Sequence, residues 1–536
     1  MKILPEDLPN DVEALKALLL EQALLLGKKD SLLSEKDSLL AQWQSKYTFI
    51  LEQWRLAQQK QFGKSSETSP GQGELFDEMA AESDVIDTET ETQTVSYTRS
   101  KPKRQPLPKD LPRETVVLDI AESDKVCLCC QGALHCIGED RSEKLDFIPA
   151  QLKVIETVRP KYACRECEKT GTQNTIKQAA MPPSIIPKGI ATPSLLSQII
   201  TGKFQYSLPL YRQETLFKQY GIELSRRTMS DWMKKCADAL KPLYERLHQE
   251  LLKQSVIQAD ETTLNVIKEA RSKCYMWVYC TGKEAPDKYN PIPNIVLYDY
   301  QSTRSGQCAV DFLQGFDGYL NVDGYQAYES TQATLAGCWA HARRKFIEAE
   351  KGMPKGKSGK ATMAINHIKK LYAIETLAQQ ADNAEGAFKI RQEQAPEVLA
   401  TYKAWLEKSA QQVPPKSLLG KAIQYNLNQW DKLTVYLTDY RVNIDNNRAE
   451  RAIKPFVIGR KNWLFSNTGN GAKSSATLYS IIETAKANGL IPYDYLVRLF
   501  EELPRRKEND DINDLLPWNI KSSLKISQPI ESNAFL

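Results

Sequence analysis

Several features are missing from this 536-residue sequence, and each absence excludes a class of protein. No apolar run approaches the roughly 20 residues that a membrane-spanning helix needs. The first residues, Met-Lys-Ile-Leu-Pro-Glu-Asp, lack the apolar segment of a signal peptide. A strong charge imbalance is also missing, because the formal net charge is only +4. We therefore expect a cytoplasmic protein without a membrane partner, in which any nucleic-acid-binding surface is local.

The cytoplasm keeps thiols reduced, so the 11 cysteines of the chain do not predict a disulfide framework. Two Cys-x-x-Cys pairs have a spacing that is typical of a structural zinc site. We predict a zinc ribbon over residues 114–185, with strands formed by apolar residues such as Val154, Ile155 and Val158. The predicted Zn²⁺ ligands are Cys127, Cys130, Cys164 and Cys167. A histidine and other cysteines nearby compete for the ion, and unligated buried thiols are the alternative.

An acidic residue interrupts an apolar, β-branched run near the middle of the chain. Residues 255–266 are typical of a short buried strand, and Asp260 lies in its centre. A buried carboxylate is unfavourable unless it is paired or binds a metal ion. A second strand-like run, 318–328, carries Asp323, and a helical stretch further on carries Glu450. This ligand set suits two Mg²⁺ (or Mn²⁺) ions in a phosphoryl-transfer site, and a capping or salt-bridged Asp260 is the alternative.

Residues 1–62 carry a seven-residue apolar repeat. Its positions are Val12, Leu19, Leu26, Leu33, Leu40, Tyr47 and Trp54. This period predicts a long helix that pairs in a coiled coil, giving a homodimer or higher assembly. An amphipathic helix that packs on its own chain is the alternative, and we expect Gly27 to divide the helix in two. Residues 63–113 lack apolar periodicity and end in a basic, proline-rich segment, which predicts a disordered linker.

Residues 190–250 have the pattern of a helix-turn-helix DNA-binding region. A helix that ends before Gly221 is followed by Ser225, a favourable N-cap for the next helix. That next helix, residues 226–235, opens with basic and hydroxyl side chains. The residues that we predict to contact DNA are Arg226, Arg227, Ser230, Lys234 and Lys235. A helical hairpin that packs on the core is the alternative.

From residue 251 the chain predicts a mixed-sheet α/β core. Further strands are expected at 275–281, 294–300 and 335–339. The interval between the second and third acids is 450 − 323 = 127 residues, which is more than one crossover needs. We therefore divide the rest of the chain into core residues 251–350, a helical insertion at 351–440, further core at 441–503 and a tail at 504–536.

Basic residues with an interleaved aromatic follow Glu450. They are Lys454, Arg460, Lys461 and Trp463. Cationic side chains position DNA through its phosphates, and a tryptophan ring stacks on a splayed base. We predict that these four residues contact the DNA substrate.

Cys338-Trp-Ala-His341 has the spacing of half a zinc site, although no second pair accompanies it. We interpret Cys338 and His341 as residues that support the metal ligands or the fold. A role for His341 as general base is the alternative. Arg343, Arg344 and Lys345 follow on the same helix, and we expect them to contact phosphate or solvent.

Four motifs carry a resemblance to a known family: ADETTLNV, VDGYQAY, GCWAHARRKF and NNRAERAIKPFVIGRKNWLFSN. In this order they resemble the transposases of the insertion-sequence-sixty-six family (the TnpC type). FGKSSE and PLPKDLPRE match as well, so the resemblance covers nearly the whole chain. It implies a DDE enzyme with a ribonuclease-H-like core, in which Asp260, Asp323 and Glu450 bind the catalytic metal ions.

The resemblance also implies a function. The protein would bind the terminal inverted repeats of an insertion sequence in double-stranded DNA, cut there, and join the 3′ ends to target DNA. Small accessory proteins of the same element would be partners, and the DNA-bound protein would lie in the nucleoid. The predicted fold is thus a multidomain α/β protein with a coiled coil, a zinc ribbon, a helix-turn-helix and a catalytic core with a helical insertion.

Two other functions stay open at this point. One is a zinc-containing DNA-binding regulator with an inactive core, although the presence of all three acids argues against it. The other is a structure-selective nuclease that carries out no strand transfer.

Overall fold

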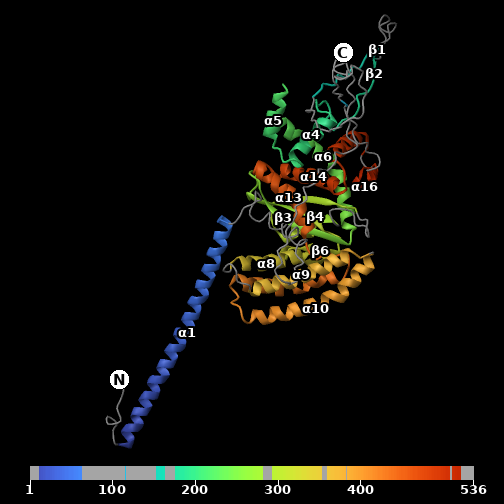
Figure 1. Ribbon diagram of the computed structural model, residues 1–536. Coiled ribbons are helices and arrows are strands. Elements are labelled where there is room, and N and C mark those ends of the chain that lie inside the picture. The colour runs from blue at the N-terminus through green and yellow to red at the C-terminus, as the bar shows by residue number, and fades with distance from the viewer. Residues whose placement is uncertain are drawn as a thin grey trace, which may run out of the picture. The chain divides into compact units, whose positions relative to one another are not determined.

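The computed structural model of the chain describes residues 11–62, 115, 152–162, 176–281, 293–352, 359–381, 383–507 and 510–520 (Figure 1). The chain divides into two compact units. The larger unit consists of Met1–Ala80, Pro183–Lys218 and Glu223–Leu524, and the smaller unit of Ala81–Pro182, Gln219–Ile222 and Lys525–Leu536. None of the helices in the described ranges combines the length and the apolar character that a membrane crossing requires.

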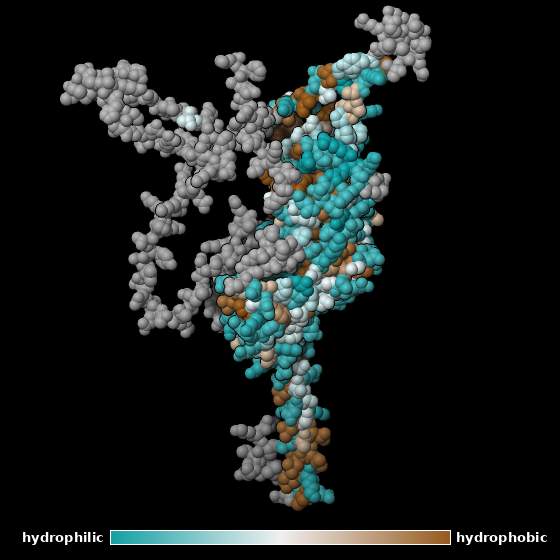
Figure 2. All heavy atoms as spheres, turned by 90° about the vertical axis from the view of Figure 1, so that its right-hand side faces the viewer, coloured by the Kyte–Doolittle hydropathy of each residue, from teal (hydrophilic) through white to brown (hydrophobic). Residues whose placement is uncertain are grey.

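The N-terminal repeat forms one continuous helix, α1 (Val12–Phe62), of 51 residues. The expected break at Gly27 is therefore wrong. One glycine costs a helix only about 1 kcal/mol relative to alanine, and good helix formers surround this one. The side chains of the repeat are exposed, between 58% and 63% at Leu19, Leu26, Leu33 and Leu40. Figure 2 shows hydrophobic side chains along this helix.

A five-stranded mixed sheet forms the core of the larger unit, in the order β5-β4-β3-β6-β7. Its strands are β3 (Val256–Asn265), β4 (Lys273–Thr281), β5 (Val296–Gln301), β6 (Tyr319–Val322) and β7 (Thr334–Gly337). β3, β4 and β5 pair antiparallel, whereas β6 and β7 run parallel to β3. The buried strand at 255–266 and the three further predicted strands are confirmed, with ends that differ by one or two residues.

The run around Asp323 is shorter than a strand over 318–328. β6 ends at Val322, because Gly324 adopts a φ of +90° and turns the chain. A short 3₁₀ segment, Gln326–Ser330, follows that turn, and α7 (Gly306–Phe312) packs beside it.

Helices α4 (Pro193–Phe204), α5 (Leu210–Gln219) and α6 (Arg226–Leu252) precede the sheet. Ser225 caps α6 as predicted, and its hydroxyl accepts the N–H of Thr228 at 3.2 Å. The helix nevertheless continues far beyond residue 235, in spite of Pro242 within it. Its extension carries buried leucines at helical spacing, so burial against the core outweighs the penalty of the proline: Leu240, Leu243, Leu247 and Leu251.

Two helices of the C-terminal part of the chain pack against the sheet. α13 (Asn447–Trp463) packs on β3 and β4, and α14 (Gly469–Ala487) packs on β5. Strand β5 lies at the edge of the sheet, and hydroxyls of α14 satisfy its outer N–H groups. Ser480 accepts from Tyr298 at 2.7 Å, and Thr484 accepts from Val296 at 3.0 Å. The remaining elements after α14 are α15 (Pro492–Glu502), Leu503–Arg505, Asn513–Leu515 and α16 (Pro517–Ile520).

Between Asp323 and Glu450 the described chain is mainly helical. Its elements are α8 (Trp339–Lys351), α9 (Lys360–Gln379), α10 (Ala384–Ala410), α11 (Leu418–Asn428), α12 (Trp430–Thr434) and the 3₁₀ segment Val435–Leu437. Figure 1 shows α9 and α10 side by side. A separate apolar core holds them together, with Trp339, Phe346 and Tyr402 fully buried.

In the smaller unit the described residues form one short antiparallel pair, β1 (Lys161–Tyr162) with β2 (Lys177–Gln178). Val154, Ile155 and Val158 were expected in strands, but they lie outside strands and are exposed. Because their side chains are exposed, β-propensity alone does not place them in strands. The four cysteines predicted to bind zinc lie outside the described residues.

Candidate active site

Asp260 lies in the middle of β3, the central strand of the sheet. The backbone N–H of Glu261 donates to Asp260 Oδ1 at 2.8 Å, which fixes the orientation of the carboxylate. Burial raises the pKa of Asp260 well above its usual range, and the negative charges of Glu261, Glu450 and Asp323 raise it further. The three predicted acids therefore act on one another electrostatically.

The register of the parallel pair β3–β6 explains why Asp323 lies near Asp260. Gln258 on β3 pairs with Asn321 on β6. Asp260 and Asp323 each lie two residues further along in the same direction, so they occupy neighbouring positions. Neighbouring strands lie about 4.8 Å apart, and aligned positions present their side chains on the same face. Asp323 is held there by the N–H of Tyr325, which donates to its Oδ1 at 3.0 Å.

The helices between Asp323 and Glu450 support the chain at Asp323. The hydroxyl of Tyr425, on α11, donates to the carbonyl oxygen of Asp323 at 2.6 Å. Gly324 permits this contact, because a Cβ there would lie 3.0 Å from Tyr425 Oη and 3.2 Å from the side-chain amide carbon of Gln429. Helix α11 thus contributes directly to the position of the second acid.

Glu450 enters from the first turn of α13, with a side chain that is 11% exposed. His341 Nδ1 lies 3.3 Å from one carboxylate oxygen, and Arg344 Nη2 lies 3.1 Å from the other. Burial raises the pKa of Glu450 to about 7, while the charge and hydrogen bond of Arg344 act in the opposite direction. Charges of Asp445 and Asp323 raise it. Glu450 is therefore a largely desolvated carboxylate with one guanidinium partner.

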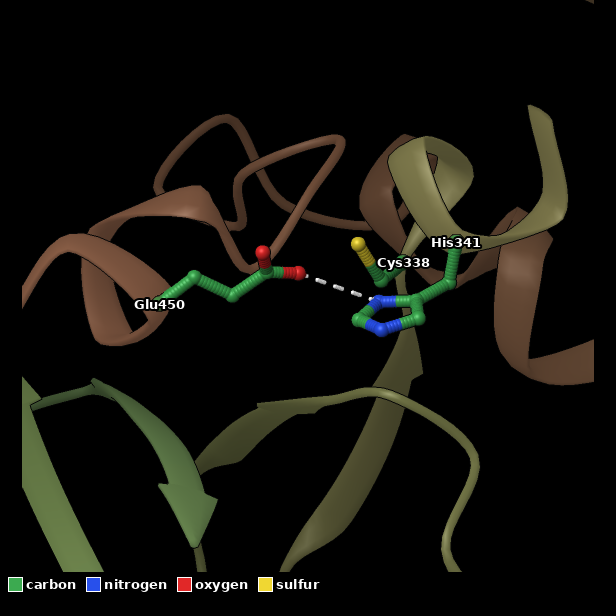
Figure 3. Close-up of side chains that lie close together, drawn as sticks. All are labelled: Cys338, His341 and Glu450. Carbon is green, nitrogen blue, oxygen red and sulfur yellow. Dashed lines mark ion pairs between the residues drawn. The ribbon is translucent and has the colours of Figure 1, made fainter. Parts of the chain in front are cut away.

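Cys338 and His341 lie next to Glu450, as Figure 3 shows. β7 pairs with β6 through Gly337 and Val322, so Cys338 follows the last paired residue just as Asp323 does. Its sulfur accepts the N–H of Asn446 at 3.2 Å, and burial raises the pKa of the thiol well above its usual range. Burial lowers the pKa of His341 to about 3, and two neighbouring cations, Arg344 and Lys345, lower it as well. One ligand atom from each of Cys338, His341 and Glu450 lies within 4.8 Å of the other two.

Glu261 is a second acid on β3 that the sequence interpretation did not single out. Its side chain is only 2% exposed and pairs with Arg304, whose Nε lies 3.0 Å from Glu261 Oε1. The hydroxyl of Tyr328 donates to its other oxygen at 2.7 Å. The guanidinium of Arg304 lies 3.7 Å from the ring centre of Tyr325. The position of Glu261 directly after Asp260 was the available signal, whereas nothing in the sequence links it to Arg304.

The residues predicted to read DNA at the start of α6 all lie on its exposed side. Arg226, Arg227, Ser230, Lys234 and Lys235 are exposed. The intervening apolar residues Met229, Trp232 and Met233 face the core. One helix thus presents a basic side to solvent and an apolar side to the protein, and its exposed contacts include a 3.9 Å pair between Arg226 and Glu214.

The four residues predicted after Glu450 have different surroundings. Lys461 is exposed and Lys454 is partly buried. Arg460 donates to the hydroxyls of Thr262 and Thr263 at 3.2 and 3.3 Å, which attaches α13 to β3. The ring of Trp463 packs edge-on against Phe204, 6.4 Å between centres, and lies 6.3 Å from Tyr479.

The contacts of Arg344 differ from those expected from the sequence. The sequence interpretation placed it with Arg343 and Lys345 toward phosphate or solvent, but its guanidinium contacts Glu450 and His341. Cys338, His341 and Arg344 share one side of α8 because they are three residues apart. That spacing was visible in the sequence. Arg344 and Glu450 are 106 residues apart, however, and no local pattern predicts their contact.

Comparisons with known proteins agree on one family. Residues 188–474 match the family "Transposase IS66 family", and residues 124–168 match "zinc-finger binding domain of transposase IS66". Residues 50–116 match "Transposase C of IS166 homeodomain", and residues 480–518 match "IS66 C-terminal element".

Three relatives from Sinorhizobium fredii (strain NBRC 101917 / NGR234) are similar over most of their length. Uncharacterized protein y4jD is 37% identical over 78% of this chain and 82% of its own. Uncharacterized proteins y4qI and y4hP are 34% and 32% identical, over 78% and 80% of this chain and 79% and 78% of their own. Among solved structures there is no match. The chain belongs to the IS66 family of transposases, DDE enzymes that transfer phosphoryl groups on DNA.

Proposed function

We propose that this transposase binds the terminal inverted repeats of its insertion sequence, cuts the DNA there, and joins the freed 3′ hydroxyls to target DNA. The observation that carries the catalytic part is the convergence of three acids from separate segments. Asp260 and Asp323 occupy neighbouring register positions of parallel strands, and the charge of Glu450 acts on Asp260. The mixed sheet with helices packed against it supports the ribonuclease-H-like core that the family resemblance implies.

The donor set fits divalent metal ions of the Mg²⁺ or Mn²⁺ type. Hard oxygen ligands suit these ions, and the three side chains supply carboxylates only. Their mutual repulsion, expressed in the raised pKa of Asp260, is what a bound cation would relieve. We propose Asp260, Asp323 and Glu450 as the ligands of two ions. Such ions activate a nucleophile and neutralise charge on a phosphoryl group when they are bound.

The protein residues supply the positioning. Backbone N–H groups of Glu261 and Tyr325 orient the carboxylates of Asp260 and Asp323. Each of these contacts uses one carboxylate oxygen. Asp260 lies within the buried strand β3, and Asp323 directly follows the neighbouring strand β6. A preorganised acid cluster lowers the cost of bringing charged groups together during the reaction.

DNA recognition is assigned to surfaces outside this cluster. The exposed basic side of α6, with Arg226 and Arg227 at its start, is suited to the major groove or its flanking phosphates. Lys461, at the end of α13, is suited to the backbone of the DNA near Glu450. Cys127, Cys130, Cys164 and Cys167 are proposed as Zn²⁺ ligands within the zinc-finger segment of the family.

The exposed heptad leucines of α1 support assembly through a coiled coil. Residues such as Leu26 and Leu33 are exposed by about 60%, and their seven-residue spacing suits an identical helix as partner. We propose a homodimer or higher assembly, which also fits an enzyme that acts on two ends of an element. Accessory proteins of the same element are further proposed partners.

A cleavage assay tests the proposal. The substrate is a labelled duplex from the end of the element that encodes the protein, with Mg²⁺, and the comparison is between wild type and Asp260→Asn. We expect the substitution to lower cleavage by at least about 10²–10³-fold, because it removes a ligand of the metal ions that would neutralise charge on the reacting phosphate. Asp317→Asn is the matched control, since Asp317 is an exposed carboxylate near the same sheet.

The outcomes separate the competing functions. Cleavage of random duplex as efficient as cleavage of the end duplex would favour a nuclease without sequence recognition. Equal activity of wild type and Asp260→Asn would refute the assignment of the catalytic acid. Joining of the cut 3′ end to a second duplex in the same reaction is the result expected for a transposase.

A further inference from the structure

The first two turns of α8 place a row of polar side chains behind Glu450. Cys338, His341 and Arg344 follow one another at three-residue intervals, beginning at the residue that precedes the helix. Arg344 contacts Glu450 through Nη2, at 3.1 Å from Oε2 and 3.4 Å from Oε1. Its other terminal nitrogen, Nη1, lies 3.0 Å from His341 Nε2. Figure 3 shows the Glu450 carboxylate directed at the imidazole ring.

The contact with Arg344 determines which nitrogen of His341 carries the proton. A guanidinium group only donates hydrogen bonds, so His341 Nε2 must accept. In the neutral ring the proton then lies on Nδ1, which is 3.3 Å from Glu450 Oε1. Nδ1 is buried and makes no hydrogen bond of standard geometry among the described residues, so the Glu450 oxygen at 3.3 Å is an acceptor within its reach. Arg344 therefore orients the histidine as a donor toward the carboxylate, in addition to contacting that carboxylate itself.

The same geometry argues against a metal ion held by Cys338, His341 and Glu450, although their ligand atoms are within 4.8 Å of one another. A metal ion on Nδ1 would displace its proton to Nε2, where the guanidinium of Arg344 already donates. The positive charge of Arg344 also lies against two of the three groups. The sulfur of Cys338 accepts the N–H of Asn446, just ahead of α13, so it fixes the start of the helix that carries Glu450.

We propose that Arg344 and His341 are positioning residues for Glu450, which hold its carboxylate in the orientation that binds the divalent ion. The inference rests on the proposed function, in which Glu450 is a metal ligand. Arg344 fixes the tautomer of His341, and His341 directs its Nδ1–H at one oxygen of Glu450 from the side of α8. Groups that orient a metal ligand in this way typically contribute 10–100-fold to metal affinity or activity.

Binding of Mn²⁺ without DNA tests the proposal independently of catalysis. Free Mn²⁺ is titrated by electron paramagnetic resonance against the full-length protein, with thermal unfolding as the check on folding. We expect His341→Leu to weaken Mn²⁺ binding by roughly 10–100-fold. His341→Asn should restore most of it, because the asparagine amide places an N–H near the position of Nδ1. Arg344→Leu should also weaken binding, whereas Arg344→Gln, which keeps a donor for Nε2, should weaken it less.

Lys345→Gln is the matched control for charge. Lys345 follows Arg344 and carries the same charge, but its ammonium lies over the ring of Tyr425, 5.8 Å from the ring centre. It should leave Mn²⁺ affinity near the wild-type value. An equal loss in Lys345→Gln and Arg344→Leu would show that the effect does not depend on the contacts of Arg344 with Glu450 and His341, and it would overturn the proposal.

Asp260→Asn separates failure of this inference from failure of the proposed function. If Asp260→Asn binds Mn²⁺ as tightly as wild type, the metal centre itself is wrongly placed. If Asp260→Asn loses binding while His341→Leu keeps it, only the positioning role is overturned. The same holds if His341→Asn is as weak as His341→Leu. Zinc in the purified protein that Cys338→Ser and His341→Leu both release would instead show a metal site in this row.

Discussion

In the helices between Asp323 and Glu450, the charges of a buried glutamate and a buried arginine neutralise each other. The carboxylates around Asp260 instead repel one another. Arg391 Nη2 lies 2.6 Å from Glu375 Oε2, and both side chains are less than 10% exposed. Arg391 Nη1 also lies 3.0–3.4 Å from four carbonyl oxygens, which share its two N–H groups. They belong to the chain that leads toward α13: Tyr436, Asp439, Tyr440 and Val442. Both terminal nitrogens of the buried guanidinium therefore have acceptors.

The acid cluster follows the opposite arrangement. Burial and three neighbouring negative charges all raise the pKa of Asp260, with one backbone hydrogen bond acting against them. Repulsion of this kind is unfavourable for folding but favourable for binding cations. The charge pair of Arg391 and Glu375 thus stabilises the fold, whereas the charge of Asp260 is suited to binding a cation. Substitutions at both places test this difference.

The largest effect is expected from removing one member of the balanced pair. Arg391→Leu should lower the free energy of unfolding by about 3–5 kcal/mol, because it leaves Glu375 buried without its partner and frees the carbonyl groups. Urea unfolding measures the change. Glu375→Gln is the control, and it should cost less because Arg391 keeps its carbonyl partners. A loss below about 1 kcal/mol in Arg391→Leu would place the pair among weak surface interactions.

Asp299 provides an intermediate case, a mostly buried acid with no guanidinium partner among the residues that the structure describes. Burial raises the pKa of Asp299 to about 6, while a hydrogen bond from Gln301 at 2.7 Å and the charge of Lys473 lower it. The folded protein thus binds more protons than the unfolded chain between about pH 4 and 6. Stability contributed by this group should fall by about 2 kcal/mol as the pH rises through that window.

The measurement compares wild type with Asp299→Asn at pH 4, 5 and 6. The amide does not titrate, so the unfolding free energy of the variant should gain on that of wild type as the pH rises. A difference that stays constant across the three pH values would show that Asp299 ionises normally in the folded protein.

The next largest loss of stability is expected at Gly324, in the turn that follows Asp323. Gly324→Ala should destabilise by about 1–2 kcal/mol, because φ is +90° and the new Cβ meets Tyr425 and Gln429. Gly315→Ala is a close control, with a φ of +85° and no atom within 4 Å of its Cβ. Both variants should lose stability, but only Gly324→Ala should also slow DNA cleavage, since Asp323 precedes it. Equal cleavage by the two variants would mean that Tyr425 does not position Asp323.

Local patterns in the sequence predicted the strands and the start of α6, and they singled out the three candidate acids, because each pattern depends on residues close together in the chain. They did not predict the end of α6, where buried leucines overcame Pro242, or the continuity of α1 through Gly27. The partners of the acids were also beyond reach. Arg344 meets Glu450 across 106 residues, and the placement of Asp323 depends on a register set by strand pairing. Such contacts follow from the fold as a whole rather than from any window of sequence.

The smallest expected effect is a gain of stability, although most substitutions of buried residues destabilise a protein. Asp260→Asn should raise the free energy of unfolding by roughly 0.5–2 kcal/mol, the range typical of stabilising substitutions at strained functional sites. The amide removes the repulsion from Glu261, Glu450 and Asp323 while nearly preserving the shape of the side chain. Mg²⁺ should then stabilise wild type, by binding only the folded state, more than it stabilises the variant. Thermal unfolding with and without Mg²⁺ measures both effects. If Asp260→Asn were less stable than wild type in the absence of metal, the carboxylate would be stabilising the fold, and the contrast with Glu375 and Arg391 would disappear.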